Sequence, residues 1–148
     1  MTPSPESLAE VAARLAALAE AEPHREICGL VEAGADGALR VVPLANRAPD
    51  PADAFEIDPA DVLAALRRVE GGAGDGPGVL LAVYHSHPRG GAGLSASDLD
   101  QALVAGGPLL PGVAQVVVAL QDGRADRVCW HRWEGGRYRP IDLWRRAG

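Results

Sequence analysis

Apolar and polar positions along the chain follow two different periods, and each period predicts one kind of element. Between residues 8 and 18 apolar side chains recur at helical spacing after a Ser-Pro start signal, which predicts a helix that ends near Pro23. Residues 27–33 and 38–44 are apolar runs of strand length, separated by the turn-forming sequence GADG. These two runs are predicted to form a β-hairpin.

The centre of the chain predicts a second helix. Asp58 is a suitable N-cap and Pro59 suits the first helical position. The residues expected on its buried face are Val62, Leu63, Leu66 and Val69. The glycine-rich segment 71–78 that follows has no phosphate-binding pattern, and no function is assigned to it. A further helix is expected from Ser95 to about Ala105.

Four more apolar segments are predicted to be strands: residues 79–85, 114–120, 127–133 and 138–144. The order of helices and strands predicts an α/β (α+β) fold, in which a mixed β-sheet is flanked by helices. Neither a repeat nor a linker interrupts this order. Residues 1–148 are therefore expected to form a single domain.

Composition and charge indicate which classes of partner and which cellular compartment to expect. The net charge of −6 argues against a nucleic acid or an acidic membrane surface as the main partner, because phosphate binding needs a basic face. No apolar run approaches the length of a membrane span, and the acidic N-terminal segment lacks the features of a secretory signal. Cys28 and Cys129 alone do not make a disulfide framework, so a reducing cytoplasm is expected. Cys129 lies within a predicted strand and is assigned to the core.

The candidate chemistry lies in the sequence HSHPRGGAGLSASD. His85 and His87 are two residues apart at the end of a predicted strand, so their side chains point to the same side. Pro88 ends the strand, a glycine-rich turn follows, and the helix that begins at Ser95 delivers Asp98. Two histidines, one aspartate and a water form a plausible catalytic zinc set, with three protein ligands and one open position.

Simpler interpretations of the same residues stand beside this one. A His-x-His pair also occurs as two polar loop residues. Ser95 and Asp98 have the spacing of an ordinary capping box, and for these two residues alone capping is the better interpretation. The whole combination is more specific than its parts, because it joins a strand end, a turn and a helix start. The sequence has neither the His-Glu-x-x-His pattern nor a Gly-x-Ser-x-Gly nucleophile elbow.

The chain resembles the JAMM (MPN+) zinc metallopeptidases. Their signature is an upstream Glu, then His-x-His-Pro, six residues and Ser-x-x-Asp, and residues 85–98 fill every position of its downstream part. The segments EPHREICGLV and FEIDPADVLAAL are similar to two further family segments. The likeness runs from about Leu8 to Leu143. It implies the JAMM/MPN fold, which is cytidine-deaminase-like.

The resemblance also implies roles for individual residues. His85, His87 and Asp98 would hold one zinc ion per chain, Glu26 would be the general base that hydrogen-bonds the zinc water, and Ser95 would stabilise the oxyanion. Glu26 is selected by the family pattern, and its position just before an apolar strand is only a supporting hint. The competing acids are Glu20, Glu22, Glu32, Glu56 and Asp58.

For function, the resemblance implies a peptidase or isopeptidase that hydrolyses the amide bond after the C-terminal Gly-Gly tail of a ubiquitin-like protein. Compact prokaryotic members process sulfur carrier proteins, so a sulfur carrier or its C-terminal adduct is the expected partner. Two alternatives are a non-catalytic MPN-type interaction domain and a zinc hydrolase of other peptide amides. Oligomeric state is left open, with a homodimer among the candidates, as are the identity of the carrier and of the released group.

Several residues near the motif are interpreted structurally. Cys28 is expected to be a small buried side chain near the site, with a thiol ligand as the alternative. His24 is assigned to a loop, with a supporting role at the site as the alternative, and His131 is assigned to the surface of the sheet. Phe55 and Ile57 have two equal interpretations, the wall of a groove beside the metal or core packing.

Overall fold

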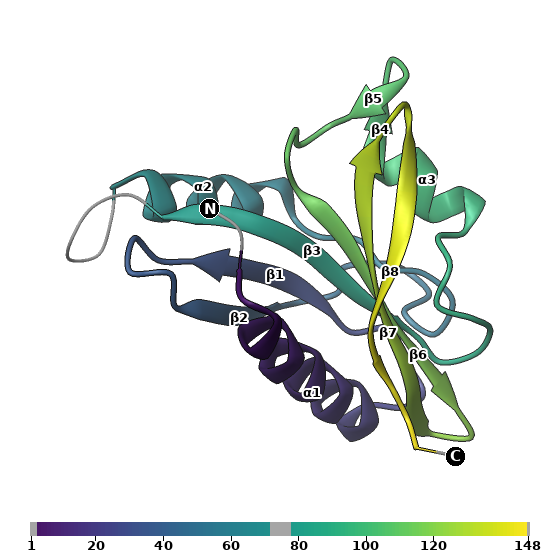
Figure 1. Ribbon diagram of the computed structural model, residues 1–148. Coiled ribbons are helices and arrows are strands. Elements are labelled where there is room, and N and C mark those ends of the chain that lie inside the picture. The colour runs from purple at the N-terminus through teal and green to yellow at the C-terminus, as the bar shows by residue number, and fades with distance from the viewer. Residues whose placement is uncertain (1–2, 72–77, 148) are drawn as a thin grey trace.

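In the computed structural model, which describes residues 3–71 and 78–147, three helices surround a six-stranded sheet (Figure 1). The helices are α1 (Pro5–Ala21), α2 (Pro59–Gly71) and α3 (Ala96–Ala102). The strands of the sheet are β1 (Cys28–Ala33), β2 (Leu39–Leu44), β3 (Val79–His87), β6 (Ala114–Gln121), β7 (Arg124–Glu134) and β8 (Arg137–Arg145). Two short strands, β4 (Leu103–Val104) and β5 (Gly107–Pro108), form a separate hairpin.

The sheet is mixed, as the sequence predicts. Its strand order is β2-β1-β3-β6-β7-β8, and the β3–β6 pair is parallel whereas the other neighbours are antiparallel. Parallel neighbours need a long crossover connection. Here the crossover between β3 and β6 contains a glycine-rich loop, α3 and the β4–β5 hairpin, and its loop packs on one face of the sheet.

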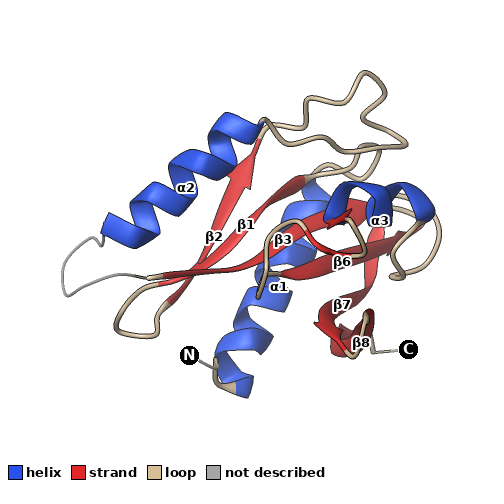
Figure 2. Cartoon of the chain, turned by 90° about the horizontal axis from the view of Figure 1, so that it is seen from above, coloured by secondary structure: helices blue, strands red, loops and turns tan. Residues whose placement is uncertain are grey.

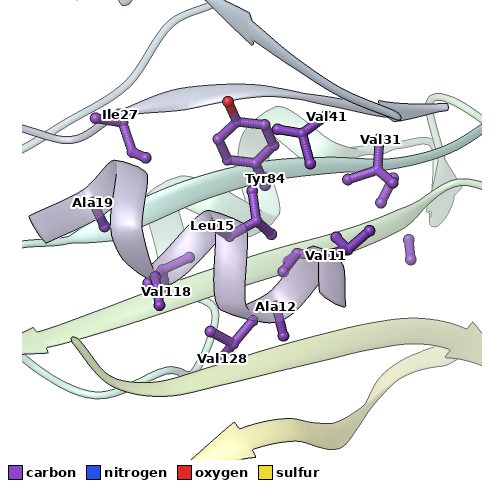
Figure 3. Packing of buried hydrophobic residues seen from close by; sticks show 14 of the residues in the cluster. Val11, Ala12, Leu15, Ala19, Ile27, Val31, Val41, Tyr84, Val118 and Val128 are labelled. Carbon is purple, nitrogen blue, oxygen red and sulfur yellow. The ribbon is translucent and has the colours of Figure 1, made fainter. Parts of the chain in front are cut away.

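Helix α1 covers the other face of the sheet. Ser4 is its N-cap and accepts a hydrogen bond from the Ser7 amide at 3.2 Å, and Pro5 lies in its first turn. Its buried residues are Val11, Ala12, Leu15, Ala16 and Ala19. They pack into one cluster with Tyr84, Val116, Val118 and Val128 of the central strands (Figure 3). The helical periodicity of the sequence therefore predicted the buried face of α1 correctly.

The opposite face is covered in two parts (Figure 2). Helix α2 covers the β1–β3 half, where Ala65 and Leu66 pack with Leu30 and Val83. Asp58 accepts a hydrogen bond from the Ala60 amide at 2.9 Å, as expected of a residue that caps this helix. Over the β6–β7 half the glycine-rich loop takes the place of a helix, with Ala92 packed in a cluster that includes Val117, Ala119 and Cys129.

The third helix is shorter than the sequence predicts. It ends at Ala102, where Leu103 enters extended conformation, and the chain turns at Ala105 and Gly106, both with positive φ, to form the β4–β5 hairpin. The Gly106-Gly107 pair was the signal for this turn. Of the glycine-rich segment 71–78, residues 72–77 lie outside the described residues. No helix in the described ranges is long and apolar enough to cross a membrane.

Leu15 provides a test of the α1 interface. Its side chain is completely buried, so Leu15→Ala should lower the free energy of unfolding by about 3–5 kcal/mol through lost apolar burial and the remaining cavity. Leu63→Ala is the control. The expectation that Leu63 lies on the buried face of α2 is wrong, because its side chain is 48% exposed, and its loss should cost less than about 1 kcal/mol. Urea denaturation measures both. Equal losses would contradict the assignment of α1 to the core.

Candidate metal centre and active-site cleft

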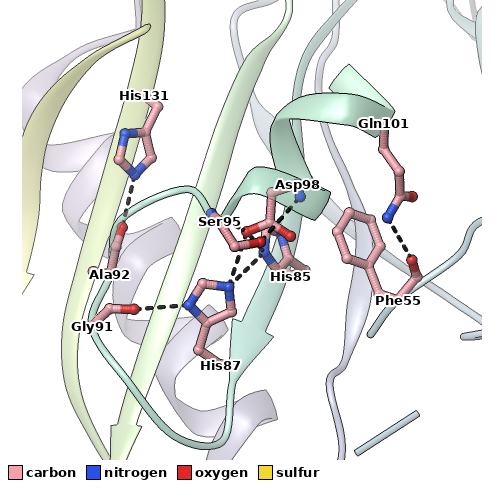
Figure 4. Close-up of polar contacts among 9 residues, drawn as sticks. All are labelled: Phe55, His85, His87, Gly91, Ala92, Ser95, Asp98, Gln101 and His131. Atoms are coloured by element: carbon pink, nitrogen blue, oxygen red, sulfur yellow. Dashed lines mark hydrogen bonds and ion pairs between the residues drawn. The ribbon is translucent and has the colours of Figure 1, made fainter. Parts of the chain in front are cut away.

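The end of β3 and the start of α3 bring three potential ligand atoms together. His85 Nε2 and His87 Nε2 are each 3.1 Å from Asp98 Oδ2, and the two nitrogens are 3.1 Å from one another (Figure 4). His85 and His87 lie on the same side of β3, because side chains alternate along a strand. The three residues proposed as ligands from sequence are therefore neighbours in the structure.

This triangle has the dimensions of a metal site. Tetrahedral bonds of about 2.0–2.1 Å place ligand atoms about 3.3 Å apart, close to the separations found here. His87 Nδ1 lies 2.8 Å from the Gly91 carbonyl oxygen, which can only accept, so Nδ1 carries a proton and Nε2 is the nitrogen that faces Asp98. Once Nε2 gives up its own proton, its lone pair can bind a metal. Two imidazole nitrogens and a carboxylate oxygen are a donor set that zinc uses.

The charges of the triangle suit a cation. Burial lowers the pKa of His85, which favours the neutral imidazole that binds metals. For Asp98, burial acts to raise the pKa, but hydrogen bonds with His85 and His87 outweigh it and keep the carboxyl pKa below its usual range. For His87, burial acts to lower the pKa, but hydrogen bonds to Asp98 and the Gly91 carbonyl outweigh it and raise the pKa, so a metal ion would have to displace the Nε2 proton that Asp98 accepts.

Glu26 lies beside the histidines in space, although β1, β2 and α2 separate it from them in the sequence. One ligand atom from each of Glu26, His85 and His87 can be chosen so that all lie within 4.8 Å of one another. Glu26 is 6% exposed, and its Oε1 is buried with no hydrogen-bond partner among the described residues. Burial raises the pKa of Glu26 to about 7. A carboxyl group of this kind can exchange a proton near neutral pH.

The backbone around Glu26 is fixed by residues that the sequence analysis did not single out. The Glu26 amide donates to the Pro51 carbonyl at 2.7 Å, and Asn46 Nδ2 donates to the Glu26 carbonyl at 2.9 Å. The buried hydroxyl of Ser86, between the two histidines, accepts from the Ile27 amide at 2.8 Å. Glu26 is therefore held at the site through its own backbone and that of its neighbour.

Ser95 is the N-cap of α3, so the capping interpretation is confirmed for it and for Asp98. The Ser95 hydroxyl oxygen accepts from the Asp98 amide at 3.1 Å, and the Ser95 amide donates to Asp98 Oδ2 at 2.9 Å. These bonds orient the carboxylate toward the histidines. They do not use the hydroxyl hydrogen of Ser95, which remains available in the cleft that this residue lines.

A cleft of about 510 Å³ opens over these groups, and its walls include Glu26, Phe55, His87, Ser95 and Asp98. His85 is completely buried beneath it, with the Phe55 ring stacked on the imidazole at 4.2 Å between centroids and 17° between planes. Gln101 Nε2 donates to the Phe55 carbonyl at 2.9 Å. Both interpretations of Phe55 are thus correct, since it packs in the core and walls the cleft.

Comparison with known proteins assigns the chain to a family. A family model described as prokaryotic homologs of the JAB domain matches residues 8–133. The chain belongs to this family. The match includes Glu26, both histidines, Ser95 and Asp98, and it agrees with the JAMM/MPN resemblance of the motif.

Individual relatives of this JAB domain agree with the assignment. A curated Haloferax volcanii protein named desampylase is 30% identical over 127 residues, which cover 84% of this chain and 81% of the relative. A Thermus thermophilus protein named probable TtuB-protein conjugate cleaving protease is 44% identical over 63 residues, 43% of this chain and 40% of that protein.

Solved structures share the fold. A solution structure from Desulfitobacterium hafniense has 25% identity and a TM-score of 0.58, covering 92% of this chain and 86% of that one. A second solution structure, from Salinibacter ruber, has 24% identity and a TM-score of 0.54, covering 99% of this chain and 92% of that one. At this level of identity the second likeness concerns the fold alone.

The remaining candidates of this JAB domain are structural, with one correction. Cys28 is buried, and burial raises the pKa of its thiol to about 11, which makes it a poor thiolate ligand. His24 is exposed in a loop, and Glu32 is buried but pairs with Arg40 at 2.7 Å and with Arg68.

The assignment of His131 to the sheet surface is wrong. It is 5% exposed, because the glycine-rich loop covers that face of β7.

Ser86 can be tested separately from the histidines. Ser86→Ala removes the acceptor of the buried Ile27 amide, which should lower the free energy of unfolding by about 1–3 kcal/mol. The substitution should not change the capacity of the site for a metal, because β3 still presents both imidazoles. Ser97→Ala, an exposed position on α3, is the matched control and should leave stability within about 0.5 kcal/mol. A Ser86→Ala protein as stable as the control would contradict this role.

Proposed function

We propose that this JAB domain is a zinc-dependent peptidase or isopeptidase. Its substrate is the amide bond after the C-terminal Gly-Gly tail of a ubiquitin-like protein, in particular a sulfur carrier protein. The observation that carries the proposal is the triangle of His85 Nε2, His87 Nε2 and Asp98 Oδ2. Beside it lies Glu26, whose buried Oε1 has no hydrogen-bond partner in the described part of the chain. We take residues 1–148 as one catalytic domain.

In this proposal His85, His87 and Asp98 would hold one zinc ion at the base of the cleft that His87 and Asp98 line. Zinc in such a site lowers the pKa of a water molecule to about 7 and polarises the carbonyl of an amide. The chain contributes the orientation of the ligands. Ser95 fixes Asp98 through the capping box, and the Gly91 carbonyl fixes the tautomer of His87.

Glu26 is proposed as the general base. Its buried Oε1 has no partner among the described residues, so it is free to accept a proton from the attacking water. The same carboxyl then delivers that proton to the amine as the carbon–nitrogen bond breaks. Ser95, whose hydroxyl hydrogen is not used in capping, is proposed to donate to the oxygen on which negative charge develops.

The substrate class rests on the relatives and on the resemblance. One relative is named desampylase, and the name of the other states that it cleaves conjugates of a protein, TtuB. A Gly-Gly tail is extended and has no side chains at its end, so it can enter a cleft and bind mainly through its backbone. These points favour a ubiquitin-like protein over the other amide substrates.

Intact-mass spectrometry tests the reaction. A sulfur carrier protein with a C-terminal cysteine adduct, and a second sample with its tail joined to a lysine side chain, are incubated with zinc-loaded protein. The expected product is the carrier ending in Gly-Gly, formed without chelator and absent with chelator. Glu26→Gln should keep zinc and lower the rate by about 10²–10⁴-fold, the usual contribution of a general base. Glu22→Gln, a nearby exposed acid, is the control.

Three results would contradict parts of this proposal. Turnover by Glu26→Gln at the control rate would remove Glu26 from the mechanism. Release that persists in chelator would exclude zinc chemistry. No release of either substrate by protein confirmed to hold zinc would exclude this substrate class and favour a hydrolase of other amides or an interaction domain.

The ligand assignment is tested by metal binding alone. His87→Ala removes one corner of the triangle, so zinc affinity measured by competition with a chromogenic chelator should fall by more than about 100-fold. His24→Ala, an exposed histidine outside the triangle, should leave the affinity unchanged. Equal affinities for the two variants would refute the proposed role of His87.

A further inference from the structure

The loop between β3 and α3, residues 88–95, is held by two imidazoles from different strands (Figure 4). His87 Nδ1 lies 2.8 Å from the Gly91 carbonyl oxygen, and His131 Nε2 lies 2.8 Å from the next carbonyl, that of Ala92. His87 is on β3 and His131 on β7, with β6 between them in the sheet. The loop therefore crosses β6 with consecutive carbonyls tied to the strand on each side.

Apart from the bonds between Ser95 and Asp98 at its end, the loop makes few other contacts with the described residues that fix its conformation. It contains three glycines, of which Gly90 has φ of +92°, and the 88–95 segment forms no helix or strand. Its apolar anchors are the Ala92 methyl, which is 2% exposed, and Leu94, both against β6 and β7. A small methyl group supplies little apolar contact, so the hydrogen bond from His131 is the directional constraint on this part of the loop.

We propose that His131 is a positioning residue for the metal site. By holding the Ala92 carbonyl it fixes the neighbouring Gly91 carbonyl, which in turn sets the tautomer and the ring orientation of His87. The proposal rests on the role of His87 as a ligand in the proposed function, and it adds a residue from β7 that lies outside the His-x-His to Ser-x-x-Asp motif.

The chemistry of His131 agrees with this role. A carbonyl oxygen can only accept, so Nε2 of His131 carries the proton and the ring points its donor at the loop. The side chain is 5% exposed, and burial lowers its pKa, which keeps the imidazole neutral. Supporting partners of a ligating histidine commonly change metal affinity by about 10–100-fold when lost. Because His131 acts through one intervening peptide, we expect an effect near the lower end.

The test compares variants that separate positioning from stability. His131→Phe keeps a buried ring but removes the donor. His131→Gln places an amide donor near the position of Nε2, whereas His131→Asn carries its donor closer to the backbone. Val128→Ala is the matched control, because Val128 is buried on the same strand but packs in the α1 cluster on the other face. Zinc affinity is measured by chelator competition, and the visible spectrum of the Co²⁺-loaded protein reports ligand geometry.

His131→Phe and His131→Asn should weaken zinc binding about tenfold and alter the Co²⁺ spectrum. His131→Gln should stay near the wild-type values, and Val128→Ala should lower stability without changing either readout. If His131→Phe does not fold, the Gln and Asn pair decides. Wild-type affinity in His131→Asn, or an equal loss in Val128→Ala, would overturn the proposal. Failure of wild-type protein to bind zinc would instead refute the proposed function.

Discussion

Strand β3 presents His85 and His87 on one face of the sheet and Ser86 on the other, because side chains alternate along a strand. On the first face the two imidazoles meet Asp98, at equal separations of 3.1 Å. On the second face the Ser86 hydroxyl accepts from the Ile27 amide and so holds the segment that carries Glu26. One tripeptide therefore organises both parts of the site, the proposed ligand atoms and the acid.

Most of the buried polar side chains in the described residues gather at the site. His85 and Ser86 are completely buried, and Glu26 and Asp98 nearly so. Such groups destabilise a fold unless they are paired. Asp98 has partners in the Ser95 amide and both histidines, whereas Glu26 Oε1 has none among residues 3–71 and 78–147. A buried acid left without a partner is typical of a functional position, where local stability is lower than the fold could reach.

The sequence was sufficient to predict most of the elements and to predict that His85, His87 and Asp98 lie together. Periodicity located α1 and the sheet strands, because α1 has one buried face and the central strands are buried on both. It failed at α3, where the Gly106-Gly107 turn ends the helical pattern early. Sequence periodicity could not predict tertiary contacts. His131 looked exposed because the loop that covers β7 comes from a distant segment, and nothing local to Asn46 or Ser86 indicates that both hold the backbone around Glu26.

The parallel pairing of β3 with β6 places the proposed ligands within one short stretch, residues 85–98, while the Ser86–Ile27 hydrogen bond that holds Glu26 spans 59 positions. Closing a longer loop costs more conformational entropy. During folding, the ligand set therefore assembles at lower entropic cost than the complete site. A chain whose β1 has not yet docked would retain a segment able to capture metal but would lack its base. If the proposed function holds, hydrolytic competence would then depend on the docking of β1 beside β3, which brings Glu26 to the histidines.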